Sequence, residues 1–319
     1  MRFALTPDQL ELADGAAALL RARCTPDAVR SAWDSPTGEI DGLWDELAEL
    51  GLLGVMTPES AGGLGLGAVE LVAVLREAGY VAAPGPLVET ALVAPAVLAQ
   101  AAASPAAQRL ASIAQGTPGA HGKHGAQAEH GKHGAQAEHG TQAEQRVAAT
   151  YQPDGRAEAP LVVPYAGIAD AVLVAHRDGR LELLTGLSTT PVATVDESRG
   201  AVHITAAAER VELTAGTGAP LGSTALALGA LGTSAQLVGL AQRCLDLAVD
   251  YAQQRQQFGA PIGSFQAVKH HLANAKLAVA FAWPTVLEAA AAFDHGRPTW
   301  QRSASAAKVL ASQAAQRVS

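Results

Sequence analysis

A long segment without a charged side chain places the strongest constraint on how this chain can fold. It runs from Leu213 to Gln242 and is long enough to cross a membrane as a helix. It also contains Pro220, two glutamines and six glycines, which lower its hydropathy well below that of a leucine-rich span. We therefore predict no membrane span and expect a helix that belongs to a protein core.

Three sequence patterns follow one another along the chain. Residues 1–115 show helical spacing that opens at Thr6-Pro7-Asp8, an N-cap residue followed by a first-turn proline and acid. Residues 146–218 carry short β-type runs between turn residues, and residues 219–319 return to helical spacing. The predicted fold class is mainly α with a small central β domain. Its predicted strands are 161–163, 171–175, 181–184, 191–195, 202–205 and 211–214.

Residues 116–145 separate the first two parts and contain a nine-residue repeat that starts at His121 and again at His130. The repeat holds five of the ten histidines of the chain, so binding of nickel, zinc or copper is one interpretation. A glycine after each histidine favours mobility over a preformed ligand set, and no carboxylate or thiolate cluster completes a site. We predict a solvated linker and assign no metal site.

Composition excludes several classes of function. A net charge of −8 leaves no basic field to hold a polyanion, so we predict no nucleic-acid partner. Cys24 and Cys244 are too few for a disulfide framework. The amino terminus has acidic residues where an export signal needs a basic start and an apolar stretch. We expect a reducing, cytoplasmic setting.

One block, at the end of a predicted helix and the start of the next, is distinctive. Its residues are Arg255-x-x-Phe258-Gly259-x-Pro261-Ile262-x-x-Phe265-Gln266. This block resembles the acyl-CoA dehydrogenase family of flavoproteins, with weaker support from 43–54 and from Gly62-Gly63-Leu64-Gly65. The resemblance implies an N-terminal helical part, a middle β-barrel or sheet and a C-terminal helical bundle. It also implies FAD as cofactor and an acyl-CoA as substrate.

The same resemblance implies a cofactor-binding role for part of the block. Five residues would reach an FAD that is held largely by a neighbouring subunit, with Phe258 packed on the cofactor: Arg255, Gln257, Phe258, Phe265 and Gln266. An arginine beside a helix end neutralises a pyrophosphate well, because its planar group forms bidentate hydrogen bonds. The alternative is that Arg255 is a helix C-terminal cation, favoured only by the helix dipole.

The catalytic base of the family is missing from this chain. Members abstract the α-proton of the thioester with a glutamate that lies either late in the chain or on the helix before the Arg255 block. The late position falls beyond Ser319, so we expect a truncated C-terminal bundle. The early position falls on Gly229, followed by Ala230 where relatives often carry an arginine that contacts CoA. Because the charge-free segment offers no carboxylate nearby, we assign no catalytic residue.

The losses extend to the flavin side of the site. The Thr-Glu-Pro-x-Ala-Gly-Ser and Trp-Ile-Thr/Ser segments of the family, which contact flavin, are both absent. The part of the site that each subunit offers to its neighbour is kept, while the chain's own part is incomplete. This pattern resembles the degenerate β subunit of actinobacterial α2β2 acyl-CoA dehydrogenases that act on bulky substrates such as sterol side chains. Electron-transfer flavoprotein is the acceptor that the resemblance implies.

Two other functions stay open from the sequence. The first is an active homo-oligomeric acyl-CoA dehydrogenase with a displaced base, for which Asp246 and Asp250 are the candidates. The second is a structural or metal-binding protein built on this scaffold, which would use the histidine repeat. The main prediction is a non-catalytic partner subunit that completes the FAD site of a catalytic chain and thereby takes part in α,β-desaturation of an acyl-CoA.

Overall fold

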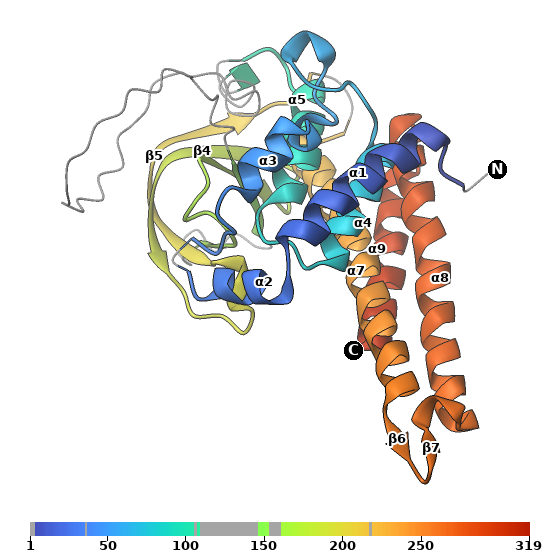
Figure 1. Cartoon of the computed structure of the whole chain (residues 1–319). Coiled ribbons are helices and arrows are strands. Elements are labelled where there is room, and N and C mark those ends of the chain that lie inside the picture. Colours follow the sequence, from blue (N-terminus) through green and yellow to red (C-terminus); the bar gives the residue numbers. More distant parts are fainter. Residues whose placement is uncertain (1–3, 36, 105–106, 109–145, 153–160, 217–218) are drawn as a thin grey trace.

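The computed structural model describes residues 4–35, 37–104, 107–108, 146–152, 161–216 and 219–319. The histidine repeat therefore lies outside the described residues. The predicted order of helical, β and helical parts is confirmed (Figure 1). The first part consists of α1 (Pro7–Arg23), α2 (Pro26–Trp33), α3 (Leu43–Glu49), α4 (Ala68–Tyr80), the π-helical turn η3 (Glu89–Val93) and α5 (Ala94–Gln100).

Local sequence explains where several of these helices begin. The side chain of Thr6 accepts the backbone N–H of Gln9, and the Gln9 side chain accepts the Thr6 N–H, which completes a capping box at α1. Thr25 caps α2 in a similar way by accepting the N–H of Ala28. Each cap is followed by a proline at the first helical position, as the Thr-Pro-Asp pattern predicts.

The β part is a five-stranded sheet with strand order β1-β3-β4-β5-β2. Its β1 and β3 are parallel, and the other neighbours are antiparallel. The two outer strands come close to each other, since the Thr150 hydroxyl lies 3.4 Å from the Val162 carbonyl oxygen. The strands are β1 (Val147–Gln152), β2 (Leu161–Val163), β3 (Ala171–His176), β4 (Leu181–Pro191) and β5 (Val202–Leu213).

Several of the predicted strands were wrong in their bounds, since 181–184 covers only the first part of β4 (Leu181–Pro191). The runs 202–205 and 211–214 are the two ends of one strand, β5, whose middle is exposed and therefore lacks an apolar signal. The run 191–195 is not a strand, because β4 ends at Pro191 and the chain turns away after one further bond, from the Val192 N–H to the Ala201 carbonyl at 3.0 Å. Strand β1 was not predicted, since its alanines and polar residues give little periodicity before the pairing with β3 is formed.

Strand β3 separates two cores. Ala171, Leu173 and Ala175 point into the main core, which also contains residues from the N-terminal and C-terminal helices. Val172 and Val174 point to the opposite face and join a smaller core inside the curved sheet. All five side chains are buried, because alternate residues of a strand face opposite sides and each side here meets apolar partners. The sheet is therefore seated directly on the helices.

The charge-free segment forms most of α7 (Leu221–Gln254), which packs against α4 and α9 (Trp300–Val318). Both α7 and α8 (Gln266–Asp294) are long and apolar enough to cross a membrane, by length and composition alone. In the most apolar window of α7, 61% of the residues are buried inside the protein, against 39% for α8. Core helices of globular proteins pass the same test, and α7 occupies such a core position.

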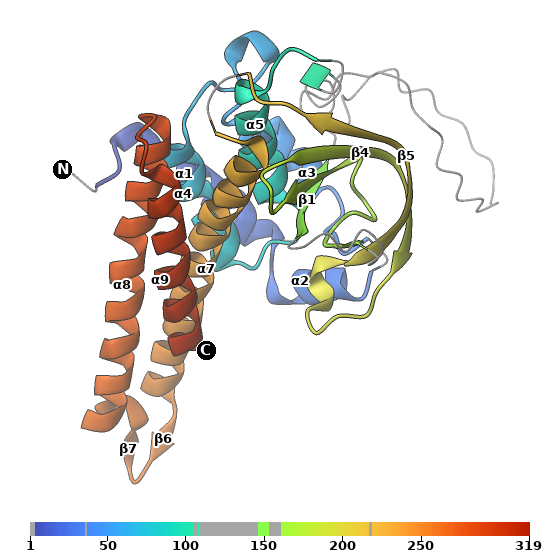
Figure 2. The ribbon, with the colours of Figure 1, turned by 180° about the vertical axis from the view of Figure 1, so that it is seen from behind.

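Small residues allow α4 and α7 to cross closely. A Cβ atom on Gly239 would overlap the carbonyl oxygen of Arg76, and one on Gly79 would overlap the carbonyl oxygen of Gln236. The C-terminal end of α8 also contacts α4, because Asp294 accepts the backbone N–H groups of Ala68 and Val69 at 2.8 and 3.0 Å. One end of the C-terminal helices is thus fastened to the body, and their other end extends away from it (Figure 2).

Candidate functional site

A two-residue hairpin joins α7 to α8 at the end that projects farthest from the body (Figure 1). Its strands are β6 (Gln256–Gln257) and β7 (Ala260–Pro261). The turn residues Phe258 and Gly259 both have positive φ angles, 53° and 78°. Tight hairpins require this left-handed backbone, but it is costly for a bulky side chain.

Phe258 is the most unusual residue of this hairpin. Its side chain is 94% exposed although its backbone is strained, so neither burial nor local conformation explains a phenylalanine at this place. The Phe265 ring lies edge-on to it, with ring centroids 6.2 Å apart. An exposed aromatic pair on a strained turn indicates a surface that is built for contact with another molecule.

Arg255 caps the C-terminal end of α7, directly beside the hairpin. Its N–H donates to the Tyr251 carbonyl, and its own carbonyl accepts the N–H of Ile262, both at 2.8 Å. These bonds position the backbone, while the side chain is exposed and forms no ion pair with any residue that the structure describes. The guanidinium group is therefore free to meet an external anion.

All five residues that the sequence predicted for the cofactor lie together at this end. Arg255 and Gln257 precede the turn, Phe258 forms it, Phe265 caps α8, and Gln266 is the first residue of α8. All five are exposed. We call this set the hairpin cluster. The structure places the cluster on one surface, and its role toward FAD stays a prediction.

The position at which the resemblance places an early catalytic base, Gly229, lies in the other half of α7. Gly229 and Ala230 are half-buried, and a Cβ atom on Gly229 would meet no atom within 4 Å. Packing therefore does not require glycine there. Gly229 lies roughly 39 Å from Arg255 along the helix axis at 1.5 Å per residue. The hairpin cluster of a chain cannot reach the base position of the same chain.

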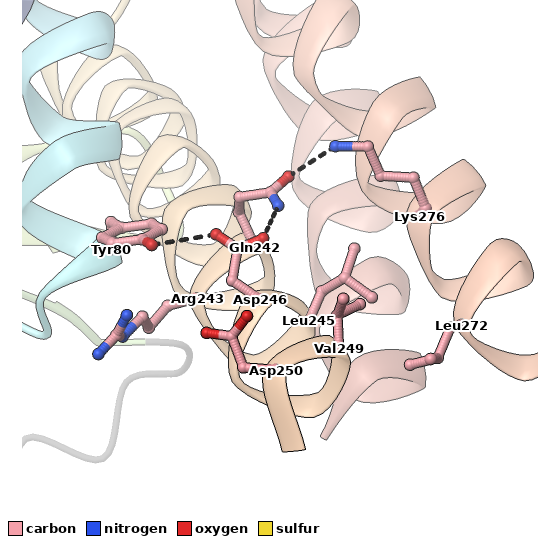
Figure 3. Close-up of a pocket in the computed structure, with 9 residues that line it drawn as sticks. All are labelled: Tyr80, Gln242, Arg243, Leu245, Asp246, Val249, Asp250, Leu272 and Lys276. Carbon is pink, nitrogen blue, oxygen red and sulfur yellow. Dashed lines mark hydrogen bonds between the residues drawn. The ribbon is translucent and has the colours of Figure 1, made fainter. Parts of the chain in front are cut away.

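The carboxylates proposed as replacements are displaced from this position. Asp246 lies roughly 26 Å along α7 from Gly229. One of its oxygens accepts the Tyr80 hydroxyl at 3.0 Å, and the other accepts the Gln242 amide at 2.6 Å (Figure 3). Asp250 lies one turn farther from Gly229. Neither carboxylate stands at the expected base position.

A polar cleft of about 500 Å³ surrounds this network on α4, α7 and α8. The Lys276 ammonium donates to the Gln242 carbonyl oxygen at 3.1 Å, which extends the chain of hydrogen bonds from Tyr80 through Asp246 to α8 (Figure 3). Sequence reasoning missed Tyr80 and Lys276. Tyr80 is separated from Asp246 by 166 positions, so no local motif signals the contact.

Partly buried ionic contacts join the helical part to the β part, and the sequence analysis did not predict them. The Arg146 guanidinium lies 2.8 Å from the Glu39 carboxylate and 5.0 Å from the Trp44 ring centroid. Burial raises the pKa of Glu39, and the nearby Arg146 charge opposes that rise. Burial likewise raises the pKa of Glu89, whose carboxylate lies 3.9 Å from Arg199. These groups hold two parts of the fold together and do not line the cleft.

Among the described residues, no group of three or more histidine, cysteine, aspartate or glutamate side chains could hold a metal ion. The metal-binding interpretation rested on the histidine repeat, which lies outside the described part of the chain. It therefore stays untested.

Comparison with known proteins places the chain in a family. Residues 6–117 match the model of the acyl-CoA dehydrogenase N-terminal domain, and residues 216–319 match that of the C-terminal domain. Acyl-CoA dehydrogenase IpdE2 of Mycobacterium tuberculosis is 34% identical over 95% of this chain and 80% of its own length. Acyl-CoA dehydrogenase FadE27 of the same organism is 30% identical over 86% of this chain and 72% of its own.

Solved structures share the fold of this chain. The ChsE4-ChsE5 complex of Mycobacterium tuberculosis matches with a TM-score of 0.78 and 24% identity, over 100% of this chain and 86% of the matched one. A Tcur3481-Tcur3483 steroid ACAD variant matches with a TM-score of 0.75 and 25% identity, over 98% and 84%. The protein belongs to the acyl-CoA dehydrogenase family of FAD-dependent oxidoreductases. The predicted family, fold class and cofactor class are confirmed.

Proposed function

We propose that this chain is a non-catalytic partner subunit, which completes the FAD site of a catalytic acyl-CoA dehydrogenase chain with its hairpin cluster. One observation carries the proposal. The exposed cluster at Arg255 and Phe258 lies roughly 39 Å along α7 from Gly229, where a base would stand and no carboxylate does. The hairpin cluster of this chain would therefore complete a site whose catalytic base is supplied by a different chain.

The residues of the hairpin cluster fit an FAD of a neighbouring chain. The Arg255 guanidinium has no ion-pair partner among the described residues and would pair with the pyrophosphate. Phe258 and Phe265 offer an apolar edge against which a flat ring system packs. Bound FAD would supply the hydride acceptor, and the base would come from the partner chain. The hairpin cluster of this chain would hold and orient the cofactor.

Relatives support a heteromeric assembly and a bulky substrate. The ChsE4-ChsE5 structure is described as a complex, and the Tcur3481-Tcur3483 protein as a steroid ACAD. We propose an α2β2 heterotetramer that desaturates an acyl-CoA with a large, sterol-derived acyl group. Electron-transfer flavoprotein would then accept the electrons.

The test is flavin reduction in the chain alone and in its complex. We would purify the chain by itself and together with any catalytic acyl-CoA dehydrogenase encoded beside it, and add acyl-CoA to both. We expect loss of the visible flavin absorbance only in the complex. Bleaching of the chain alone would overturn the proposal and favour an active homo-oligomer with a displaced base.

The variant Arg255→Ala tests the cofactor contact. We expect the assembled complex to lose at least half of its flavin, because one charge-assisted pair to the pyrophosphate is removed. Arg255→Lys should recover part of it, since charge is kept without bidentate geometry. Arg210→Ala is a matched control, because Arg210 is an exposed arginine on β5 that pairs with Glu182. Unchanged flavin content in Arg255→Ala would contradict the assignment.

A further inference from the structure

A second hollow, of about 520 Å³, lies where the C-terminal ends of α1 and α4 meet α2 and α7. Three arginines line it, Arg21, Arg30 and Arg243, and so do Trp33 and Tyr80. No carboxylate of the described residues is part of its lining. We call it the arginine hollow. It shares Tyr80 and Arg243 with the polar cleft but none of the residues of the hairpin cluster.

The three arginines differ in how their charges are balanced. Arg21 lies 3.0 Å from the Glu77 carboxylate, and Arg30 lies 3.4 Å from that of Asp27, an exposed pair. Arg243 is half-buried and forms no ion pair with any described residue. A partly buried arginine without a counter-charge is unusual, because desolvation costs are normally offset by pairing. Asp246 and Asp250 line the polar cleft on the other side of Arg243, but neither is paired with it, and the arginine hollow itself has no carboxylate in its lining. A bound anion in the hollow would therefore supply the counter-charge.

Aromatic rings give the arginine hollow a second chemical character. The guanidinium carbons of Arg21 and Arg243 lie 5.1 and 5.4 Å from the Tyr80 ring centroid, so the ring orients both groups. Trp33 is 47% exposed at the same place, although a tryptophan normally hides most of its surface. An exposed indole beside oriented guanidinium groups suits a ligand that has both a flat ring and an anionic part.

The remaining wall is uncharged. Val29, Val81 and Leu240 contribute apolar surface. Burial raises the pKa of the Cys24 thiol to about 11, so this side chain is neutral and unreactive near neutral pH. The hollow thus combines an apolar wall with a cationic rim, and its volume lies within the range of roughly 300–1,000 Å³ typical of small-molecule sites.

The Tyr80 ring, which both guanidinium groups approach, is held in place by hydrogen bonds on α7 and α8. The Tyr80 hydroxyl donates to Asp246, which also accepts from Gln242, and Gln242 in turn accepts from Lys276 (Figure 3). In Figure 3 the Arg243 side chain extends away from this network, beneath the Tyr80 ring. The network therefore fixes the Tyr80 ring before any ligand binds, which lowers the entropic cost of binding.

From this geometry we propose that the arginine hollow binds a nucleoside phosphate, with the phosphates on Arg21 and Arg243 and the base against Trp33. Phosphate groups match several arginines better than a single carboxylate does, because they carry more charge and more acceptor oxygens. A purine supplies the flat ring. The shared chemistry is an adenosine diphosphate unit, which occurs in free ADP, in the nucleotide part of CoA and in FAD, whose contact with this chain is assigned above to the hairpin cluster.

Isothermal titration calorimetry on the full chain, alone and in its complex, tests this site. The probes are ADP, CoA and inorganic pyrophosphate. We expect saturable binding of ADP and CoA and weaker binding of pyrophosphate. Similar affinities for ADP and CoA identify the free nucleotide unit as sufficient, whereas tighter binding of CoA identifies CoA as the source. No heat from either nucleotide at millimolar concentration overturns the proposal.

Variants test the contacts to the phosphates and the contacts to the base separately. Arg243→Gln should weaken ADP binding at least tenfold, and Arg21→Gln less, because Arg21 already pairs with Glu77. Trp33→Ala should weaken ADP binding and leave pyrophosphate binding unchanged, since only the base meets the indole. Arg210→Gln is the control and should change neither. Arg243→Lys keeps the positive charge, so it serves as a control for misfolding as the cause of any loss of ADP binding.

The proposal for the arginine hollow can be wrong while the proposed function is right, and the measurements tell the two apart. Arg255→Ala removes the guanidinium of the hairpin cluster but should leave ADP binding to the isolated chain unchanged. If Arg243→Gln binds ADP as well as the parent chain does, the arginine hollow is not the site, whatever the flavin measurements show.

Discussion

The two halves of α7 use one continuous helix for different purposes. All of its buried residues except Leu245 and Ala252 lie before Gln242, and that half packs into the main core. The second half carries polar residues, exposes Leu247 and Tyr251, and ends in the hairpin cluster. Because the first half is buried in the core, it holds the helix rigidly. The exposed second half can therefore present a contact surface without a separate domain to support it.

The chemistry of the two halves explains the difference. The first half is rich in glycine, alanine and leucine, which allows backbones to approach and apolar surface to be removed from water. The second half has Gln253 and Gln254 before Arg255, which interact well with water or with another chain. If this comparison is right, substitutions in the first half change stability, and substitutions at the far end change assembly with FAD.

Gly239→Val should have the largest effect. A side chain there would overlap the Arg76 carbonyl oxygen and lie 2.7 Å from the Tyr80 nitrogen, so α4 and α7 would have to separate. We expect a loss of about 3 kcal/mol or more in the free energy of unfolding, measured by urea denaturation. Gly229→Ala is the matched control, because its Cβ meets nothing within 4 Å. It should stabilise the helix by about 0.5–1 kcal/mol.

Asp294→Ala should have the next largest effect on stability, at the end of the C-terminal helices that is hydrogen-bonded to α4. Asp294 accepts two N–H groups at the start of α4, which lack partners within the helix. We expect a loss of about 1–2 kcal/mol, as for an N-cap residue, again by urea denaturation. Asp294→Asn should lose less, because the amide oxygen still accepts one N–H. Equal losses in both variants would show that charge, not hydrogen bonding, fastens this end.

Phe258→Gly should have the smallest effect on stability and a large one on assembly. The exposed ring adds no burial, and glycine removes the left-handed strain, so the isolated chain should gain up to about 1 kcal/mol. The assembled complex should retain less flavin. Phe258→Ala keeps the strain and removes the ring, so it should lose flavin without the gain. A destabilised Phe258→Gly chain would contradict the division between the two halves of α7.

The sequence predicted features that are local. The charge-free segment indicated a core helix, and the Thr-Pro-Asp pattern indicated the start of α1, because both signals lie within a few turns of backbone. The Arg255 block was recognisable for the same reason, since a hairpin between two helices keeps its residues together in the chain. Strand β5 was predicted only in part, because its exposed middle is held by pairing with β4 and not by its own pattern.

The tertiary structure decided everything that depends on distant contacts. Tyr80 meets Asp246, and Asp294 meets Ala68 across 226 positions, by the way helices pack and not by any spacing in the chain. The same packing creates the arginine hollow from α1, α2, α4 and α7. The sequence alone determined the order of elements, the family and the hairpin cluster, because these follow from neighbouring residues. Which side chains share a surface was decided only by folding, because burial of the core brings distant segments together.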